Sequence, residues 1–347
     1  MNPLNDLFAS QRPSVFIIAE AGVNHNGSLE MAKKMVDAAV ESGVDAIKFQ
    51  TFKAGQLVTI NAQKALYQKE TTGSGESQYE MLKRLELDQK RHSELIEYCK
   101  KRNIIFLSTP FDFESVELLE KLNIPAYKVS SGDITNLPFL EHIARKNKPV
   151  ILSTGMAGLG EVEEAVGAVR KGGNSQIILL HCTSNYPTEF KDVNLKAMLT
   201  LKHAFQVPVG YSDHTLGIEV PIAAVALGAS MIEKHFTLDR NLPGPDHRAS
   251  LEPEELKAMV LAVRNVEKAL GDGIKRCQDV EANVKETARK SIVPLKDLVK
   301  GEVLTREALG FKRPGTGLPP KFIDFLIGKK VRRDIAKDSI IALTDIE

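Results

Sequence analysis

The sequence contains no tryptophan and only three cysteines, Cys99, Cys182 and Cys277, among its 347 residues. An odd and scattered set of cysteines argues against a disulfide framework, and no CxxC or CxxH spacing offers a zinc site. A surplus of one charge is lacking too, because 46 Lys and Arg face 45 Asp and Glu, which leaves a net charge of +1. Without an overall basic field, the chain is not expected to bind nucleic acid. The cysteine usage predicts a reducing compartment, and hence a cytoplasmic protein.

Long hydrophobic runs are also missing. None reaches the roughly 18 residues that a membrane-spanning helix needs, so no membrane association is expected. The first residues, MNPLNDLFASQRPS, show no basic segment followed by an apolar core, and no signal peptide is predicted. The composition, with 43% hydrophobic and 26% charged residues, is that of an ordinary globular protein. The length predicts one large domain together with a smaller module.

Short apolar runs alternate with amphipathic segments over the first two thirds of the chain. Helix-like periodicity covers residues 28–42, which end before Gly43, and residues 253–270, which begin with Pro253 and end before Gly271. Eight strand–helix units in a row predict an α/β fold, a (β/α)8 or TIM barrel, over residues 1–271. The eight strands are predicted at Val15–Ala19, Val44–Phe49, Ile104–Leu107, Ala126–Val129, Val150–Leu152, Ile177–Leu180, Val207–Gly210 and Ser230–Glu233.

One connection is too long for this repeat. Some 50 residues separate Phe49 from Ile104, whereas a βα connection takes about 2–6 loop residues in addition to its helix. An insertion that includes the polar stretch 69–78 is therefore predicted after the second strand. In a barrel, such an insertion lies over the active face.

The pattern changes after Gly271. Residues 272–285 are polar and weakly patterned and are interpreted as a linker, and short β-like pieces at 291–295, 303–304 and 340–343 predict a small β-rich domain over 286–347. Residues 285–347 hold 14 basic and 9 acidic side chains, a net charge of +5, which leaves −4 for the rest. Either this domain has a solvated basic face, or one of its basic side chains reaches an anionic site.

Polar side chains close every predicted strand of the barrel. Barrel enzymes place their reactive groups at these C-terminal strand ends, and a purely structural barrel has no reason to concentrate polar groups there. The residues are Glu20, Lys48, Gln50, Ser108, Thr109, Lys128, Ser130, Ser131, Asp133, Ser153, Thr154, His181, Cys182, Ser184, Tyr186, Ser212, Asp213, His214, Glu233, Lys234 and His235.

Two subsets suggest particular chemistry. The first is a phosphate or phosphoenol site, because lysines supply charge and hydroxyls supply hydrogen-bond donors; its members are Lys48, Lys128, Ser108 or Thr109, Ser131, Ser153 and Ser212. The second is the pair His214 and His235, which end neighbouring strands. Two neutral imidazoles in this position can bind one divalent metal. The alternatives are lysines that reach solvent and histidines that are hydrogen-bonded in the core.

Two carboxylates are further candidates. Glu20 closes the first strand and is suited to general acid–base work, or else it pairs with a lysine. Asp246 lies in the stiff turn LPGPD, where it either recognises a hydroxyl or forms an Asx turn.

Many of these residues lie in motifs that resemble the sialic acid synthase family, whose members make N-acetylneuraminate, N,N′-diacetyllegionaminate and related nonulosonic acids. The segment FKRPGTG (311–317) resembles the C-terminal antifreeze-like SAF domain of that family, a β-clip fold. The resemblance covers the whole chain in the right order. The barrel motifs are IIAEAGVNHNG (17–27), KFQTFKA (48–54), LSTPFD (107–112), KVSSGDITNLP (128–138), ILSTGM (151–156), LLHCTSNYP (179–187), GYSDHT (210–215), EKHFTLD (233–239) and PGPDH (243–247).

The resemblance implies condensation of phosphoenolpyruvate with open-chain N-acetylmannosamine to give N-acetylneuraminate, with release of phosphate by C–O cleavage. The alternative is a N,N′-diacetyllegionaminate synthase that uses a 2,4-diacetamido-2,4,6-trideoxyhexose. In both, Mn²⁺ or Mg²⁺ bound by His214 and His235 polarises the sugar aldehyde, and Glu20 is the general acid–base.

The resemblance also assigns the binding residues. Lys48, Lys128, Ser131, Ser153 and Ser212 match positions around phosphoenolpyruvate, and Gln50, Tyr186 and Asp246 match the sugar side. Arg313 matches an arginine that the SAF domain donates to the partner's barrel, which implies a domain-swapped homodimer. Asp133 departs from the family, where many relatives have the longer Glu, so a hydrogen bond there is expected to differ.

A hypothesis from another functional class is a non-catalytic protein that binds a sugar or a phosphate on a barrel without enzymatic activity. Such a protein would tolerate loss of Glu20 or of the histidine pair. Both are present, together with Lys48 and Lys128, which favours an enzyme.

Overall fold

The computed structural model describes residues 3–8 and 14–347 and divides into two compact units, Met1–Gly271 and Asp272–Glu347. Residues 1–2 and 9–13 belong to the N-terminal stretch in which no signal peptide is predicted, and they lie outside the described residues. In the described ranges, no helix has the length and apolar character to cross a membrane.

Eight parallel strands form the centre of the first unit. Their order is β3-β2-β1-β8-β7-β6-β5-β4, and the two outermost strands, β3 and β4, also contact each other, so the sheet is a nearly closed barrel. The predicted α/β TIM barrel is thereby confirmed. The strands are β1 (Phe16–Gly22), β2 (Ala46–Thr51), β3 (Ile105–Pro110), β4 (Tyr127–Val129), β5 (Val150–Ser153), β6 (Ile177–His181), β7 (Val209–Asp213) and β8 (Met231–His235).

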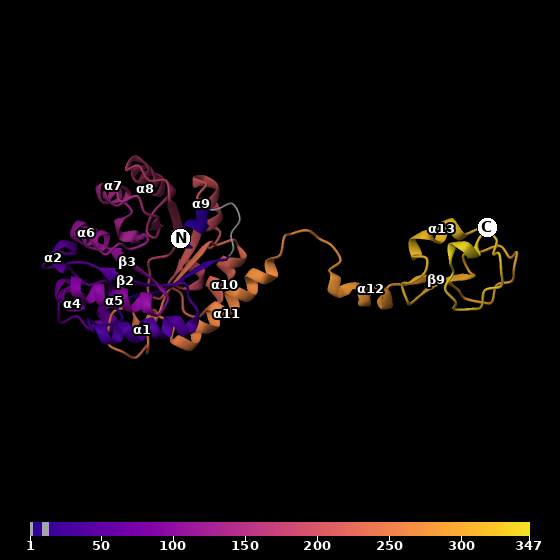
Figure 1. The fold of residues 1–347 in the computed structure, drawn as a ribbon, viewed down its shortest axis with the longest axis horizontal. Helices are drawn as coiled ribbons and strands as arrows, with labels where there is room; N and C mark the ends of the chain where they lie inside the picture. Colours follow the sequence, from indigo (N-terminus) through magenta and orange to yellow (C-terminus); the bar gives the residue numbers. More distant parts are fainter. Residues whose placement is uncertain (1–2, 9–13) are drawn as a thin grey trace. The chain divides into compact units, whose positions relative to one another are not determined.

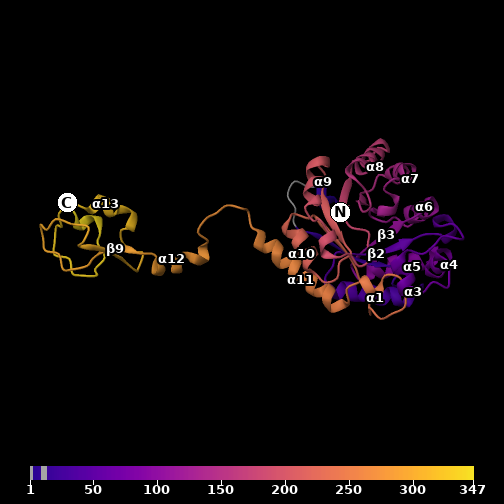
Figure 2. The same cartoon turned by 180° about the vertical axis from the view of Figure 1, so that it is seen from behind.

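Helices cover the outside of the strands (Figure 1). The helices predicted at 28–42 and 253–270 are α1 and α11. The first begins after Ser28, whose hydroxyl accepts a hydrogen bond from the Met31 amide, and it ends at Gly43, which has a left-handed backbone. From behind, α6, α7 and α8 follow one another around the barrel (Figure 2). The covering helices are α1 (Leu29–Ser42), α5 (Gln89–Lys101), α6 (Phe113–Lys121), α7 (Leu137–Ala144), α8 (Leu159–Lys171), α9 (Ala197–Phe205), α10 (Glu219–Ala226) and α11 (Pro253–Leu270).

Alternate residues of each strand face opposite sides of the sheet, and this alternation places the polar groups. Ile18 and Ala46 are ladder partners in an apolar cluster at the start of the strands, to which the 3-10 helix η1 (Pro3–Phe8) adds Leu4 and Leu7. Two residues further along, Glu20 pairs with Lys48. The barrel interior is thus apolar at one end and polar at the end where the strands finish.

The strands run further than the sequence predicts. Gln50 and Thr109 are ladder partners, as are Glu20 and His235, although each lies beyond its predicted strand. These residues were predicted to close the strands, and the ladder includes them because its hydrogen bonds use the backbone and do not depend on side-chain polarity. The polar site residues are therefore held by the sheet itself.

The insertion predicted after β2 is present. It holds three short helices, α2 (Ala54–Leu57), α3 (Leu66–Thr72) and α4 (Gln78–Leu85), before α5 begins. Its side chains form a small apolar cluster with Val23 and Phe52 of the barrel. The Ala54 amide donates to the Glu86 carboxylate at 2.7 Å, which ties the two ends of the segment together. We call residues 54–86 the insertion.

The second unit has its own core, made of residues such as Ile292, Leu304 and Val331. Two antiparallel strands, β9 (Ser291–Pro294) and β10 (Leu309–Lys312), run through it, with α12 (Ala282–Ala288) before them and α13 (Ile323–Leu326) after them. The β-rich character is confirmed. The helix α12 spans the predicted linker boundary, which the weak pattern there did not indicate.

The prediction of a β-like segment at 340–343 is wrong. Residues 340–343 form no strand; Ile341 is fully buried in the core, and a 3-10 turn, η7 (Leu343–Asp345), follows. The turn forms because the Asp345 carboxylate accepts a hydrogen bond from the Ala342 amide at 2.9 Å. The β-bridge in this region is formed instead by Ile346, which pairs with Val331.

Candidate active site

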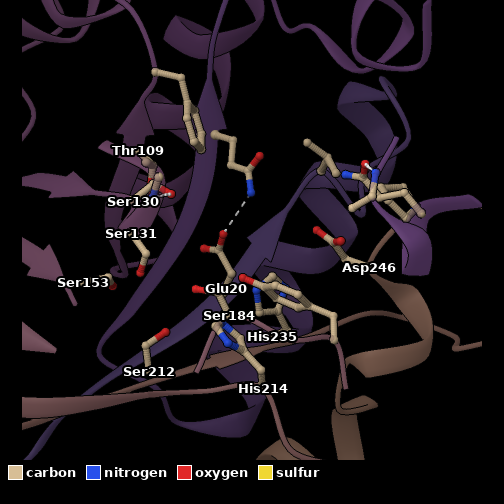
Figure 3. Close-up of a pocket in the computed structure, with 18 of the residues that line it drawn as sticks. Glu20, Thr109, Ser130, Ser131, Ser153, Ser184, Ser212, His214, His235 and Asp246 are labelled. Carbon is tan, nitrogen blue, oxygen red and sulfur yellow. Dashed lines mark hydrogen bonds between the residues drawn. The ribbon is translucent and has the colours of Figure 1, made fainter. Parts of the chain in front are cut away.

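A cavity of about 440 Å³ opens at the C-terminal ends of the barrel strands. The predicted site residues of the first unit line it, apart from Asp133, and several of them are labelled in Figure 3. In this view Ser131, Ser153 and Ser212 lie on one side of Glu20 and Asp246 lies on the other, with His214 and His235 close to Glu20.

Two lysines and two carboxylates form the buried centre of the cavity. Lys48 Nζ lies 2.7 Å from Glu20 Oε2 and 3.7 Å from Glu233 Oε2, while Lys128 Nζ lies 3.5 Å from Glu233 Oε1. Lys48 also donates to the Thr109 hydroxyl at 2.9 Å. Because these charged side chains are at most 5% exposed, water screens them little, and their interactions are strong.

The two carboxylates have opposite pKa shifts. Burial raises the pKa of Glu20 to about 7, against the opposing charge of Lys48. Burial also raises the pKa of Glu233, but Lys128, Lys48 and the hydroxyl of Ser212, which donates at 3.0 Å, outweigh it and lower that pKa to about 2. Glu233 is thus a permanent anion, whereas Glu20 exchanges a proton near neutral pH, as a general acid–base must.

The two lysines also differ. Burial lowers the pKa of Lys48, but Glu20 and Glu233 outweigh burial and raise it, so Lys48 stays charged. Burial lowers the pKa of Lys128, with Glu233 opposing. When Glu20 is protonated, the cluster holds two cations and one anion, which favours binding of an anionic substrate.

His214 and His235 are neighbours at the ends of β7 and β8, with ring centroids 5.4 Å apart. His214 Nδ1 lies 2.6 Å from the Thr183 carbonyl oxygen. A carbonyl only accepts, so Nδ1 carries the proton and Nε2 of the neutral ring keeps its lone pair. His235 Nδ1 is buried without a hydrogen-bond partner.

These two rings fit a divalent metal as a two-histidine site. Burial lowers the pKa of both histidines, so both are neutral, as metal ligation requires. Within residues 3–8 and 14–347, no group of three or more His, Cys, Asp and Glu side chains is arranged to hold a metal.

The serine side of the cavity offers hydrogen-bond donors. The Ser131 hydroxyl accepts from the Gly155 amide at 2.9 Å and lies 3.2 Å from Cys182 Sγ. Ser153 Oγ is buried and has no partner. A buried hydroxyl without a partner is costly, so it is available for a ligand oxygen.

The opposite side carries Asp246 and two tyrosines. Burial raises the pKa of Asp246 to about 6, with Lys48 opposing. The ring of Tyr67, from the insertion, stacks on Tyr186 at 5.0 Å. Gln50 donates weakly to Glu20 at 3.4 Å, the dashed line in Figure 3. This side offers both acceptors and donors, as a polyhydroxylated ligand requires.

Asp133 does not line this cavity. It ends the 3-10 turn η2 (Ser131–Asp133), and its carboxylate accepts a hydrogen bond from the Asn136 side-chain amide at 3.3 Å. Arg313 belongs to the second unit, and its guanidinium donates to the Ala288 carbonyl at 3.1 Å. Its role in a partner's site stays a prediction.

Glu233 was predicted as a strand end but not as a site residue. The strand period of two contains the signal, since Glu233 and His235 face the cavity while Lys234 points outward to Asp213 Oδ2 at 2.5 Å. Tyr67 was missed too, and nothing in its local sequence marks it, because its place depends on how the insertion folds.

Comparison with known proteins agrees with this geometry. Residues 35–275 match the NeuB family and residues 289–347 match the SAF domain. The N,N'-diacetyllegionaminic acid synthases of Campylobacter jejuni and Legionella pneumophila are 53% and 50% identical to the chain. The matches cover 94% and 96% of this chain and 98% and 94% of the relatives.

More distant relatives lie in the same group. Human N-acetylneuraminate-9-phosphate synthase is 39% identical over 94% of this chain and 91% of its own length. The crystal structure of N-acetylneuraminic acid synthetase from Leptospira borgpetersenii, in complex with citrate, has a TM-score of 0.69 and 40% identity, covering 78% of this chain and 90% of that one. The chain therefore belongs to the NeuB family of phosphoenolpyruvate-dependent nonulosonic acid synthases and carries a C-terminal SAF domain.

Proposed function

We propose that this enzyme is a N,N′-diacetyllegionaminate synthase, which condenses phosphoenolpyruvate with a 2,4-diacetamido-2,4,6-trideoxymannose. The observation that carries this choice is the gap in identity, with two legionaminic acid synthases at 53% and 50% and the human N-acetylneuraminate-9-phosphate synthase at 39%. The N,N′-diacetyllegionaminate hypothesis, given as the alternative in the sequence analysis, is thus better supported than the N-acetylneuraminate hypothesis.

The reaction forms a carbon–carbon bond and a carbon–oxygen bond to water, and it breaks the carbon–oxygen bond to phosphate. Carbon 3 of phosphoenolpyruvate bonds to the aldehyde carbon of the open-chain sugar, and the aldehyde oxygen gains a proton. Water adds at carbon 2, and cleavage of the C–O bond there releases phosphate. The product is a nine-carbon 2-keto acid.

The charged centre of the cavity serves these steps. Lys48 and Lys128 bind the anionic groups of phosphoenolpyruvate, with the hydroxyls of Ser131, Ser153 and Ser212 as donors. Glu20 holds and moves the proton of the aldehyde oxygen, because its pKa of about 7 lets it give and take a proton at neutral pH. Asp246, Gln50 and Tyr186 bind the sugar.

The neutral imidazoles of His214 and His235 would hold Mn²⁺ or Mg²⁺. When bound there, such an ion acts as a Lewis acid that polarises a substrate carbonyl. The Thr183 carbonyl, 2.6 Å from His214 Nδ1, fixes the ring with Nε2 free for the metal.

Further parts of the proposal concern the whole chain. Residues 1–271 form the catalytic domain, 272–285 a linker and 286–347 the SAF domain, and two chains exchange SAF domains so that Arg313 reaches the sugar N-acyl group in the partner. The cytoplasmic location stays a prediction from cysteine usage.

The test is a panel of N-acyl hexosamines with phosphoenolpyruvate and Mn²⁺, followed by phosphate release and product mass. We expect a nine-carbon keto acid, with a higher kcat/KM for the diacetamido sugar than for N-acetylmannosamine. A preference for N-acetylmannosamine would favour the neuraminate reading, and no product with either sugar would overturn both. The double variant His214→Ala/His235→Ala should lose Mn²⁺ binding by calorimetry as well as activity.

A further inference from the structure

The cavity has an apolar wall for which the reaction chemistry has no use. Its residues come largely from the insertion, and they are Val23, Leu57, Val58, Met81, Leu82 and Leu85. We call this set the apolar wall. The charged groups lie within the barrel strands, whereas the chain leaves the barrel after Thr51, so the wall stands beyond the strand ends.

The apolar wall lies toward the Asp246 side of the cavity. An atom placed at the Cβ position of Gly22 would lie 3.8 Å from Asp246 Oδ2, and Val23 is the next residue. The insertion touches the same loop, because the Thr71 hydroxyl donates to the Pro245 carbonyl at 3.3 Å. Figure 3 shows the serines on the other side of Glu20.

The insertion is also fixed internally, so its wall is a preformed surface. Lys64, only 4% exposed, donates from Nζ to the Thr72 hydroxyl at 2.9 Å, the Gly73 carbonyl at 3.0 Å and Glu76 at 2.9 Å. The hydroxyl of Ser77 caps α4 through the Glu80 amide. A wall held in this way discriminates between ligands without first having to be ordered.

The geometry points to the apolar wall as the element that selects the sugar, by contacting methyl groups on the carbons farthest from the aldehyde. This rests on the proposed function. With the aldehyde at Glu20 and phosphoenolpyruvate on the serine side, the rest of an open-chain sugar extends toward Asp246 and the wall. A 2,4-diacetamido-2,4,6-trideoxy sugar carries an acyl methyl on the 4-nitrogen and a methyl at carbon 6.

N-acetylmannosamine carries hydroxyls at both of these carbons. Against Leu57, Val58 and Met81 such hydroxyls would lose hydrogen bonds to water, and these three side chains offer no oxygen or nitrogen in return. One methyl in an apolar pocket is worth roughly 10–200-fold in kcat/KM. The class of substrate that fits the wall is therefore an acylated deoxyamino sugar.

The test changes polarity at nearly constant shape. Leu57→Asn and Val58→Thr each place a polar group in the wall at two positions that are only partly buried. The matched control is Leu66→Asn, the same change at an insertion residue that is 79% exposed and does not line the cavity. Each variant is assayed with both sugars, and its Tm is measured.

We expect the ratio of kcat/KM, diacetamido sugar over N-acetylmannosamine, to fall roughly tenfold in each wall variant, with the KM for phosphoenolpyruvate unchanged. The control should keep the wild-type ratio. Wall variants with wild-type Tm and an unchanged ratio would overturn the inference. If the wild-type enzyme uses neither sugar, the proposed function fails instead, so the two failures are distinct.

Discussion

Glu20 and Glu233 show how position alone gives one residue type two chemistries. Both are buried beside Lys48, but Glu233 also faces Lys128 at 3.5 Å and accepts a hydrogen bond from Ser212. Two cations and a hydroxyl keep Glu233 ionised, while Glu20 has one strong partner and a pKa of about 7. Glu20 is thus identified as the acid–base group because it lacks the second lysine and the serine hydroxyl that keep Glu233 ionised.

Glu20 makes stability depend on pH. Because the pKa of Glu20 rises from 4.5 to about 7 on folding, the folded state binds more protons in this window, and the free energy of unfolding falls as pH rises through it. In Glu20→Gln this loss should vanish. Urea unfolding from pH 4.5 to 7 measures it, with the exposed Glu254→Gln as control. A wild-type minus Glu20→Gln difference that is constant with pH would contradict the assignment.

Gly155 has room for no side chain. A Cβ there would lie 2.8 Å from Ser131 Oγ and 3.0 Å from Cys182 Sγ, and closer still to Ser184 Oγ. Gly155→Ala should therefore displace Ser131 and raise the KM for phosphoenolpyruvate by roughly tenfold or more. Side-chain ends can shift, so Tm should change little. The control is Gly160→Ala in α8, which has open space, and an unchanged KM in Gly155→Ala would refute the role of Ser131.

At the scale of elements, the insertion and the barrel strands are fixed by different forces. Backbone ladders hold Glu20, Lys48 and His235 in register. The insertion has only short helices, and one buried cation, Lys64, gathers Thr72, Gly73 and Glu76 around it. Tyr67 reaches the cavity because this segment is closed.

Lys64→Met tests that closure. Loss of the cation removes the Lys64 donor from Thr72, Gly73 and Glu76, of which Glu76 keeps only Arg84, so the insertion should loosen and Tyr67 should leave Tyr186. We expect kcat/KM for the sugar to fall roughly tenfold to a hundredfold and the KM for phosphoenolpyruvate to stay the same. Hydrogen exchange should speed up within 64–84. The control is Lys83→Met, whose surface pair with Glu86 is 58% exposed at the lysine; equal effects of both variants would contradict the model.

Elements differ in how well sequence predicts them. The bounds of α11 and the end of α1 follow from Pro253, Gly271 and Gly43, whose backbone preferences are local. The pairing of Glu20 with Lys48 follows from the barrel once its strands are recognised. The position of Tyr67 depends on its contact with the distant Tyr186, and no local pattern contains it. The turn at Asp345 is local, since its hydrogen bond joins residues three apart, but the apolar run at 340–343 favoured a strand there.

At the scale of the whole molecule, charge is divided unevenly. Residues 285–347 carry +5 and the remainder −4, and Arg313 is an exposed side chain of the basic unit whose guanidinium donates to the Ala288 carbonyl at 3.1 Å. A guanidinium has five N–H donors, so it can also donate to a ligand, as the proposed exchange of SAF domains requires.

Subunit mixing tests the exchange. Glu20→Gln and Arg313→Ala chains are each expected to be impaired, but a mixed dimer should contain one intact site if Arg313 acts in the partner. Activity should then rise on refolding the two chains together, toward about a quarter of the wild-type value for random pairing. The control mixes each variant with itself. If Arg313 acts within its own chain, mixing restores nothing.

The hydrogen bond from the Ala54 amide to Glu86, at 2.7 Å, has an evolutionary consequence. It closes the base of a segment that is held internally by Lys64 and packs on Val23 and Phe52 of the barrel, so the segment can be exchanged as a unit if those apolar contacts are kept. A lineage can exchange such a segment while Glu20, Lys48 and Glu233 stay untouched beneath it. Sugar choice and carbon–carbon bond chemistry can then be inherited separately, and the same exchange is open to protein engineering.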